Sequence, residues 1–262
     1  MNRGYKVKIV HYVKDGSRKC GVLSGEMIFK IEGDIFSRFR VIEEKHQPLK
    51  EVKVLPPVHP SKVIAIGINY RDHAEEFGHD IPSEPVLFMK PSTSIIGHED
   101  EIVYPASSRR VDYEAEIAAV VKQKAFRVSP EEARRYILGY TCLNDVTARD
   151  LQRKDGQWTR GKSFDTFCPI GPVIETELNP DNVNIRSRLN GELRQSSNTK
   201  NFIFDISHLV SFISHIMTLL PGDIITTGTP SGVGEMNPGD TVEVEVEGIG
   251  ILRNRVVGGP SV

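Results

Sequence analysis

Several stretches of the chain have the hydrophobic pattern of β-strands. Thr241–Glu247 alternates valine and glutamate, so one face of that strand is expected to be buried and the other wet. Lys62–Ile68 and Pro85–Met89 are short apolar runs of the length that buried strands have. An Asn-Gly pair at 190–191 tolerates positive φ angles, so residues 183–196 are predicted to form a β-hairpin.

Helical patterns are fewer than strand patterns. Ser129-Pro130-Glu131-Glu132 is a capping box that predicts a short helix through Tyr136. Phe204–Leu220 has apolar residues at helical spacing, and Val146–Arg153 is expected to form a third, shorter helix. The sequence therefore predicts a β-dominated α+β fold without regular βαβ alternation.

The chain divides into two parts near residue 57. The first part contains short β-like runs, Tyr5–Val13, Cys20–Leu23 and Met27–Ile31, separated by turn residues. A proline-rich segment, residues 56–60, then interrupts any helix and acts as a stiff linker. We expect a small N-terminal domain over residues 1–57 and a larger domain over residues 58–262.

Composition narrows the class of protein. The 262 residues contain 33 Lys+Arg and 35 Asp+Glu, a formal net charge of −2, and this balance argues against nucleic-acid or membrane-surface partners. The apolar runs are far shorter than the roughly 20 residues of a spanning helix, and the N-terminus does not have the pattern of a signal peptide. Three cysteines without a CxxC motif favour a reducing compartment, so a cytoplasmic location is expected.

Acidic residues open an otherwise apolar segment, 111–120. Residues two apart share a face of a strand, so Asp112, Glu114 and Glu116 are expected on one side, with apolar residues following. Adjacent carboxylates at the edge of an interior repel one another unless a cation lies between them. Oxygen ligands alone indicate Mg²⁺, Mn²⁺ or Ca²⁺. The alternative is a strand end whose acids face water.

Three more polar positions have both a structural and a chemical interpretation. Asp145 is placed either to cap a helix or to supply a third carboxylate to a metal site. Lys162 is either a surface lysine or a buried cation. His73 and Glu76 stand three apart, either as a polar turn of helix or as a general base whose carboxylate fixes the imidazole.

Six motifs stand in one order along the chain: Asn69-Tyr70…His73…Glu76, Phe88-Met89-Lys90-Pro91, Tyr113-Glu114-Ala115-Glu116, Asn144–Asp150, Gly161–Asp165 and Thr227–Gly234. Their order and spacing resemble those of the fumarylacetoacetate hydrolase family, and the resemblance covers roughly Pro57 to Val257. It implies that family's mixed β-roll together with a small, β-rich N-terminal domain.

The resemblance also implies a set of site residues. Glu114, Glu116 and Asp145 correspond to ligands of a catalytic Mg²⁺ or Mn²⁺, and Lys162 to the cation that steadies developing enolate charge. The remaining implied roles are a catalytic dyad and the positions that hold the substrate's oxygens: His73 and Glu76 for the dyad, and Arg149, Gln152 and Thr229 for substrate binding. Members that cleave fumarylacetoacetate itself carry a further aspartate ligand where this chain has Asn69, which favours the smaller acylpyruvase, decarboxylase and isomerase branches.

The implied function is a Mg²⁺- or Mn²⁺-dependent enzyme that forms an enolate from a small 2-oxo acid and cleaves a C–C bond. Acylpyruvate hydrolysis and oxaloacetate decarboxylation both fit that description. One alternative is an isomerase or decarboxylase of 2-hydroxy-2,4-dienedioates from aromatic breakdown, and another is a non-catalytic protein that binds metal and a 2-oxo acid. Family resemblance further implies a homodimer, with a small-molecule substrate as the other partner.

Overall fold

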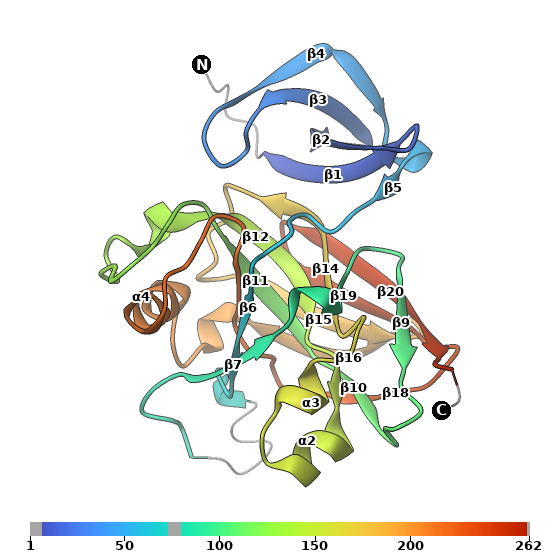
Figure 1. Ribbon diagram of the computed structural model, residues 1–262, viewed down its shortest axis with the longest axis vertical. Helices are drawn as coiled ribbons and strands as arrows, with labels where there is room; N and C mark the ends of the chain where they lie inside the picture. Colours follow the sequence, from blue (N-terminus) through green and yellow to red (C-terminus); the bar gives the residue numbers. More distant parts are fainter. Residues whose placement is uncertain (1–6, 73–79, 261–262) are drawn as a thin grey trace.

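The computed structural model of the protein describes residues 7–72 and 80–260, and strands dominate them (Figure 1). Over these residues the strands form three sheets of twelve, three and five strands. The predicted β-dominated α+β fold is confirmed. None of the helices in these two ranges is both long and apolar enough to cross a bilayer.

The large sheet is mixed and has the order β4-β3-β2-β1-β14-β12-β11-β17-β6-β7, with β5 paired to β1 and β8 paired to β14. Its strands are β1 Lys8–Lys14, β2 Ser17–Ser24, β3 Met27–Gly33, β4 Phe39–Pro48, β5 Lys53–Val54, β6 Val63–Gly67, β7 Val86–Lys90, β8 Ile95–Ile96, β11 Ala115–Val121, β12 Ile137–Asn144, β14 Cys168–Glu175 and β17 Ile224–Thr226. The strands predicted at 62–68 and 85–89 are β6 and β7. β6 is fully buried as predicted, whereas β7 lies at the edge of the sheet and exposes Val86 and Met89, so its predicted burial is wrong.

Two smaller sheets complete the strand architecture. The five-stranded sheet has the order β16-β15-β19-β20-β9, and the three-stranded sheet has the order β13-β10-β18. Their strands are β9 Glu101–Tyr104, β10 Val111–Tyr113, β13 Thr147–Ala148, β15 Asn184–Leu189, β16 Glu192–Asn198, β18 Gly234–Met236, β19 Thr241–Val246 and β20 Gly250–Gly258. The predicted hairpin is β15–β16, with φ angles of 54° at Asn190 and 83° at Gly191. In β19 every second residue is buried, as the valine–glutamate alternation predicts.

Helices are short and lie at the edges of the sheets. Three α-helices and four 3₁₀ helices occur in the described part of the chain: α2 Arg149–Asp155, α3 Thr159–Lys162, α4 Ile206–Ile216, η1 Leu49–Glu51, η2 Ser92–Ser94, η3 Ala133–Tyr136 and η4 Thr199–Asn201. The helix predicted within 204–220 is α4, whose first turn is capped by the Asp205 carboxylate at 2.8 Å from the His208 N–H.

Two helix predictions need correction. The helix predicted from Ser129 to Tyr136 is a turn followed by η3, because its N–H groups bond three residues back and the chain must enter β12 at Ile137. The helix predicted from Val146 starts later, at Arg149, since residues 147–148 pair with β10 as strand β13.

The acidic segment 111–120 forms two strands where one was predicted. β10 pairs with β13 and β18, whereas β11 pairs with β12 and β17, so the chain leaves one sheet and enters another at Glu114. Neither glycine nor proline marks this break in the sequence. The break matters because it gives Asp112, in β10, different surroundings from Glu114 at the break and Glu116 in β11.

Strand β11 lies in the centre of the protein, and all seven of its residues are buried. On one face Ile117 and Ala119 belong to the apolar cluster that includes Val244 of β19. On the other face Ala118 and Val120 belong to a second apolar cluster. Because alternate residues of a strand point to opposite faces, protein covers both sides of β11. The acidic residues at its start are therefore drawn out of water.

The N-terminal strands form a lobe at the top of the molecule in Figure 1, while α2 and α3 lie at the bottom. Strands β1 to β5 make up this lobe. It joins the rest of the large sheet where β1 pairs with β14, through Lys8 with Glu175 and Ile9 with Ile174. The domain boundary at residue 57 stays a prediction.

Candidate metal centre and substrate cavity

Three carboxylates meet where β10, β11 and β12 come together. Glu114 lies between β10 and β11, Glu116 lies in β11, and Asp145 directly follows β12. Ala115 pairs with Asn144 across the two long strands, and the Asp145 N–H donates to the Glu114 carbonyl at 2.9 Å. One oxygen of each carboxylate therefore lies within 4.8 Å of the others.

The sequence left open whether Glu114 and Glu116 face water and whether Asp145 caps a helix, and the structure answers both questions. Glu114, Glu116 and Asp145 are all buried, so the water-facing alternative is wrong. Asp145 does not cap a helix, because α2 begins four residues later at Arg149. Lys162 is only 2% exposed, so its interpretation as a surface lysine is also wrong.

Two buried lysines approach the carboxylates from different elements. Lys162, the last residue of α3, donates from Nζ to Glu114 at 2.8 Å and to Asp145 at 2.5 Å. Lys90, the last residue of β7, donates to the other Asp145 oxygen at 2.5 Å and to the Val146 carbonyl at 3.1 Å. An ammonium group is stable in an interior only beside anions, so both lysines belong to the charge balance of the site.

The carboxylates differ in their ionisation. Burial disfavours charge on Glu114, but Lys162 and Arg149 outweigh it and lower the pKa of Glu114. Burial, and then the neighbouring charge of Asp145, raise the pKa of Glu116 well above its usual range. Burial opposes the charge of Lys162 as well, yet its two carboxylate partners raise the pKa of Lys162, so this lysine stays a cation.

A divalent cation fits this set of donors. Glu116 accepts a hydrogen bond from the Gly228 N–H at 2.9 Å, and no lysine or arginine among the described side chains forms an ion pair with it. A cation between the three carboxylates would relieve the repulsion that raises the pKa of Glu116. Three oxygen donors without sulfur or nitrogen are the ligands that hard cations prefer. The triad can therefore hold a metal ion.

Arg149 is fixed beside the triad by three groups. Its Nε donates to Asp112 at 2.9 Å, Nη1 donates to Gln152 at 2.7 Å, and Nη2 is hydrogen-bonded to Glu114. Asp112, which is fully buried, also accepts from Arg110 Nε at 2.9 Å. A guanidinium has five N–H donors, so two of them stay available to Arg149 for a ligand.

Thr229 lines the same cavity, but its hydroxyl is already engaged. The hydroxyl donates to the Ala115 carbonyl at 2.9 Å and accepts from Gln195 Nε2 at 2.8 Å. Gln195, buried in β16, also accepts from the Ala115 N–H at 3.0 Å. These bonds hold the glycine-rich loop against the start of β11, next to the carboxylates.

A cavity of about 370 Å³ is lined by two of the three carboxylates, Glu114 and Asp145. One wall is aromatic: the rings of Phe88 and Trp158 meet edge to face at 5.1 Å, and Lys162 Nζ lies 5.0 Å from the centre of the Phe88 ring. The lining residues combine this wall with charged groups: Ile66, Gly67, Ile68, Phe88, Glu114, Asp145, Arg149, Gln152, Arg153, Trp158, Lys162 and Thr229. The cavity thus brings together Lys162, two of the predicted ligands and all three predicted substrate-binding residues.

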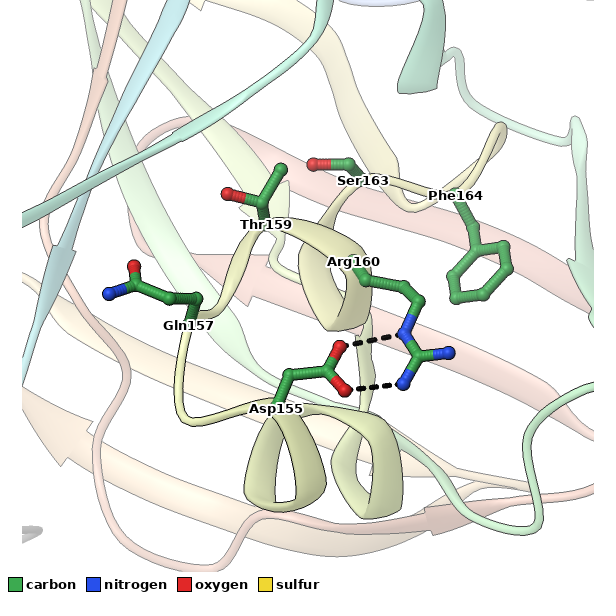
Figure 2. Close-up of a pocket in the computed structure, with 6 residues that line it drawn as sticks. All are labelled: Asp155, Gln157, Thr159, Arg160, Ser163 and Phe164. Atoms are coloured by element: carbon green, nitrogen blue, oxygen red, sulfur yellow. Dashed lines mark hydrogen bonds and ion pairs between the residues drawn. The ribbon is translucent and has the colours of Figure 1, made fainter.

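A second hollow is lined by residues of α2 and α3 and of the segments that follow each of them (Figure 2). Its main polar feature is the ion pair between Arg160 and Asp155, in which Arg160 Nε donates at 2.7 Å. Thr159, Ser163 and Phe164 complete its rim. The charges of this hollow neutralise one another, and none of the predicted site residues lines it.

The family resemblance also singled out His73, Glu76 and Asn69. His73 and Glu76 lie outside the residues that the structure describes, so their role as a dyad stays a prediction. The side chain of Asn69 is engaged with backbone groups: its amide accepts from the Phe204 N–H at 2.8 Å and donates to the carbonyls of Phe204 and Thr227, at 3.0 and 2.8 Å. Through these bonds Asn69 connects the segment at Phe204 to the loop that begins at Thr227.

Two residues that shape the site, Lys90 and Asp112, were not predicted from the sequence. Lys90 stood in one of the family motifs, yet a role for it required knowing that β7 ends beside Asp145. Asp112 was grouped with Glu114 and Glu116 because all three share a strand face. Its position before the break between β10 and β11 places it with arginines instead.

This strand-built protein combines a buried carboxylate triad that can hold a metal ion with cationic groups beside one cavity. Residues 62–257 match the family model described as "Fumarylacetoacetate (FAA) hydrolase C-terminal". The chain belongs to this family, and its fold is the mixed β-roll that the resemblance implied.

Known relatives agree with this assignment. An uncharacterized protein of Archaeoglobus fulgidus is 57% identical over 87% of this chain and 90% of its own length. "Oxaloacetate tautomerase Fahd2a, mitochondrial" from Rattus norvegicus is 42% identical over 80% of this chain and 71% of its own length. The crystal structure of 2-hydroxyhepta-2,4-diene-1,7-dioate isomerase from Mycobacterium marinum, 38% identical, superposes with a TM-score of 0.91 over 97% of this chain and 100% of that one.

Proposed function

We propose that this protein is a Mg²⁺- or Mn²⁺-dependent enzyme that moves a proton on a small 2-oxo acid, interconverting the keto and enol forms of oxaloacetate or a related 2-oxo dicarboxylate. The observation that carries the proposal is that two carboxylates of the triad, Glu114 and Asp145, line one cavity together with Lys162 and Arg149. The relatives named as an oxaloacetate tautomerase and a dienedioate isomerase support proton transfer as the reaction type.

The metal would be held by Glu114, Glu116 and Asp145. When bound, it supplies Lewis acidity that polarises the 2-oxo group and makes the neighbouring C3 proton more acidic. Mg²⁺ and Mn²⁺ are proposed because the donor set consists of carboxylate oxygens alone.

Two cations would orient the substrate. Arg149 keeps two N–H donors after its bonds to protein, which is the number that a bidentate carboxylate contact needs. Lys162 has three donors and uses two on Glu114 and Asp145, so one is left for the substrate oxygen on which negative charge develops. In a buried cavity such a fixed positive charge stabilises the enolate far better than water would.

Proton transfer itself is assigned to His73, with Glu76 fixing its ring. The imidazole takes the C3 proton, the C–H electron pair forms the C2–C3 double bond, and the C2–O π pair moves to the oxygen, which then receives the proton back from the imidazolium. This assignment rests on the family resemblance alone.

The second candidate is C–C bond cleavage, by decarboxylation of oxaloacetate or hydrolysis of an acylpyruvate. The family's own description as hydrolases favours it. It would use the same residues, because cleavage of the C3–C4 bond also leaves electrons that flow into an enolate next to Lys162. The two candidates differ in product: tautomerisation conserves all carbons, whereas cleavage releases pyruvate.

The test follows enol absorbance and pyruvate in the same oxaloacetate samples, with Mg²⁺, Mn²⁺ or EDTA. We expect metal-dependent loss of enol well above the background of the metal alone, without matching pyruvate.

Lys162→Met should slow the reaction by about 100-fold or more, the usual effect of losing one group that stabilises developing negative charge. Lys154→Gln, an exposed lysine outside the cavity, should leave it unchanged.

Each contrary outcome has a distinct meaning. Pyruvate formed as fast as enol is lost would make C–C cleavage the reaction. Turnover confined to longer unsaturated dicarboxylates would indicate the dienedioate isomerase. Binding of metal and 2-oxo acid without any turnover would identify a non-catalytic binding protein.

A further inference from the structure

Two cations of the cavity, Lys162 and Arg149, already form ion pairs with protein carboxylates. Lys162 is bonded to Glu114 and Asp145, and Arg149 is bonded to Asp112, Gln152 and Glu114. Together they have donors left for one end of a 2-oxo acid. A second carboxylate on the substrate would need another cation.

Arg153 is such a cation. It lies one helical turn after Arg149 on α2, so both side chains leave the same face of the helix, about 5–6 Å apart at their Cβ atoms. It lines the same cavity as Glu114 and Asp145, and it is exposed. Across residues 7–72 and 80–260 no hydrogen bond or ion pair engages its guanidinium. The two acids of α2 have other partners: Asp155 is bound to Arg160 (Figure 2), and Asp150 accepts from the Ser108 hydroxyl at 2.7 Å and the Arg109 N–H at 3.0 Å.

The space next to Arg153 suits a flat carbon chain. The Trp158 ring packs directly against the backbone of Gly67, where an added Cβ would lie 2.5 Å from the indole. Trp158 in turn meets Phe88 edge to face, so the two rings form a fixed aromatic wall. This wall, Arg153 and the carboxylates line a single cavity.

We infer that Arg153 binds the second carboxylate of the substrate and selects 2-oxo dicarboxylates over 2-oxo monocarboxylates. The inference rests on the proposed function, since it presumes that a 2-oxo acid group occupies the inner end of the cavity. A planar guanidinium with all five donors available forms a bidentate contact with a carboxylate, and lysine offers only a point charge there.

The chain provides its own probe for this binding. Trp158 is the only tryptophan in the sequence, and it lines the cavity. Its fluorescence therefore reports ligand entry without depending on turnover. Protein with Mg²⁺ would be titrated with 2-oxoglutarate, a dicarboxylate, and with 2-oxobutyrate, which has the same 2-oxo acid end and no second carboxylate.

We expect the unchanged protein to bind 2-oxoglutarate about tenfold or more tightly than 2-oxobutyrate. Arg153→Gln should weaken 2-oxoglutarate by about tenfold, which corresponds to about 1.4 kcal/mol, and leave 2-oxobutyrate unchanged. The affinity of Arg153→Lys for 2-oxoglutarate should lie between those of the unchanged protein and Arg153→Gln. Lys154→Gln removes a neighbouring exposed charge outside the cavity and serves as the matched control, so its affinities should equal those of the unchanged protein.

Two results separate failure of this inference from failure of the proposed function. If both ligands bind, and Arg153→Gln weakens them equally or not at all, Arg153 does not select the second carboxylate and the proposed function stands. If neither ligand changes the fluorescence and no 2-oxo acid is turned over, the proposed function is wrong and the inference is wrong with it.

Discussion

Asp145 is the most heavily bonded of the three candidate ligands. One of its oxygens accepts from Lys90 and the other from Lys162, both at 2.5 Å, and all three side chains are at most 2% exposed. Removing one partner of a buried ion pair leaves an uncompensated charge, which is far more costly than losing a surface pair. The stability of the fold and the charge of the site are therefore coupled at this residue.

Lys90→Met tests that coupling. We expect the free energy of unfolding to fall by about 3–5 kcal/mol, because Asp145 loses a buried cationic partner. Added Mg²⁺ should restore part of the loss, since a cation at the triad replaces the missing positive charge. Urea unfolding with and without Mg²⁺ measures both effects.

The control for this variant is Lys62→Met. It breaks another short pair, Lys62 with the buried Asp223 at 2.5 Å, which lies outside the cavity. This protein should also lose stability but gain no more from Mg²⁺ than the unchanged chain does. An equal Mg²⁺ response in the two variants would contradict the assignment of the triad as the metal site.

At the residue scale, the sequence predicted acidic groups better than their partners. Glu114, Glu116 and Asp145 were found because carboxylates in apolar surroundings are unusual and their motifs match a family. The positions of Lys90 and Asp112 depend on which strands lie side by side, and pairing between distant strands is not written in local sequence. The residues that pair with these acids could therefore be identified only from the fold.

At the scale of elements, β1 connects the N-terminal lobe to the rest of the protein and carries an unusual histidine. Burial, followed by the charges of Arg18 and His59, lowers the pKa of His11 from 6.5 to about 4. In an unfolded chain the same imidazole is expected to keep a pKa near 6.5. His11 is therefore neutral in the fold over a range where the unfolded chain takes up a proton.

This difference predicts acid sensitivity. Between pH 6.5 and about 4 the unfolded state binds more protons at His11 than the folded state, so stability should fall as the pH falls through that window. His11→Gln should flatten this part of the curve of unfolding free energy against pH. His46→Gln, an exposed histidine on β4, is the control and should keep the slope of the unchanged protein. The same slope in His11→Gln and the unchanged chain would contradict the prediction.

Strands were predicted more accurately than helix ends and strand breaks. Alternation and apolar runs identify β6, β7 and β19 because a period of two is imposed by the pleat itself. The break at Glu114 was missed because the residues around it all suit a strand, and only the change of pairing partners divides β10 from β11. The late start of α2 has a similar cause, since β13 uses residues 147–148 for pairing.

On the scale of the whole molecule, the cavity is assembled from distant parts of the chain. Its lining residues come from β6 and β7, the start of β11, the end of β12, helices α2 and α3, and the loop that holds Thr229. Strands β1 to β5 contribute none of them among the described residues. The family motifs predicted this convergence, whereas the pairing of β1 with β14 had no signal in the sequence.

Calorimetric titration with Mg²⁺ shows whether Glu114, Glu116 and Asp145 form a metal site. The unchanged protein should bind one Mg²⁺ per chain and release a proton on binding, because the pKa of Glu116 is raised and a ligand must be deprotonated.

The variant for comparison is Glu116→Gln, which conserves the size of the side chain. Its affinity for Mg²⁺ should fall by more than about 100-fold, since losing even a residue that only supports a ligand costs about 10- to 100-fold, and the proton release should disappear. A folded Glu116→Gln protein that binds Mg²⁺ as tightly as the unchanged chain would contradict the account.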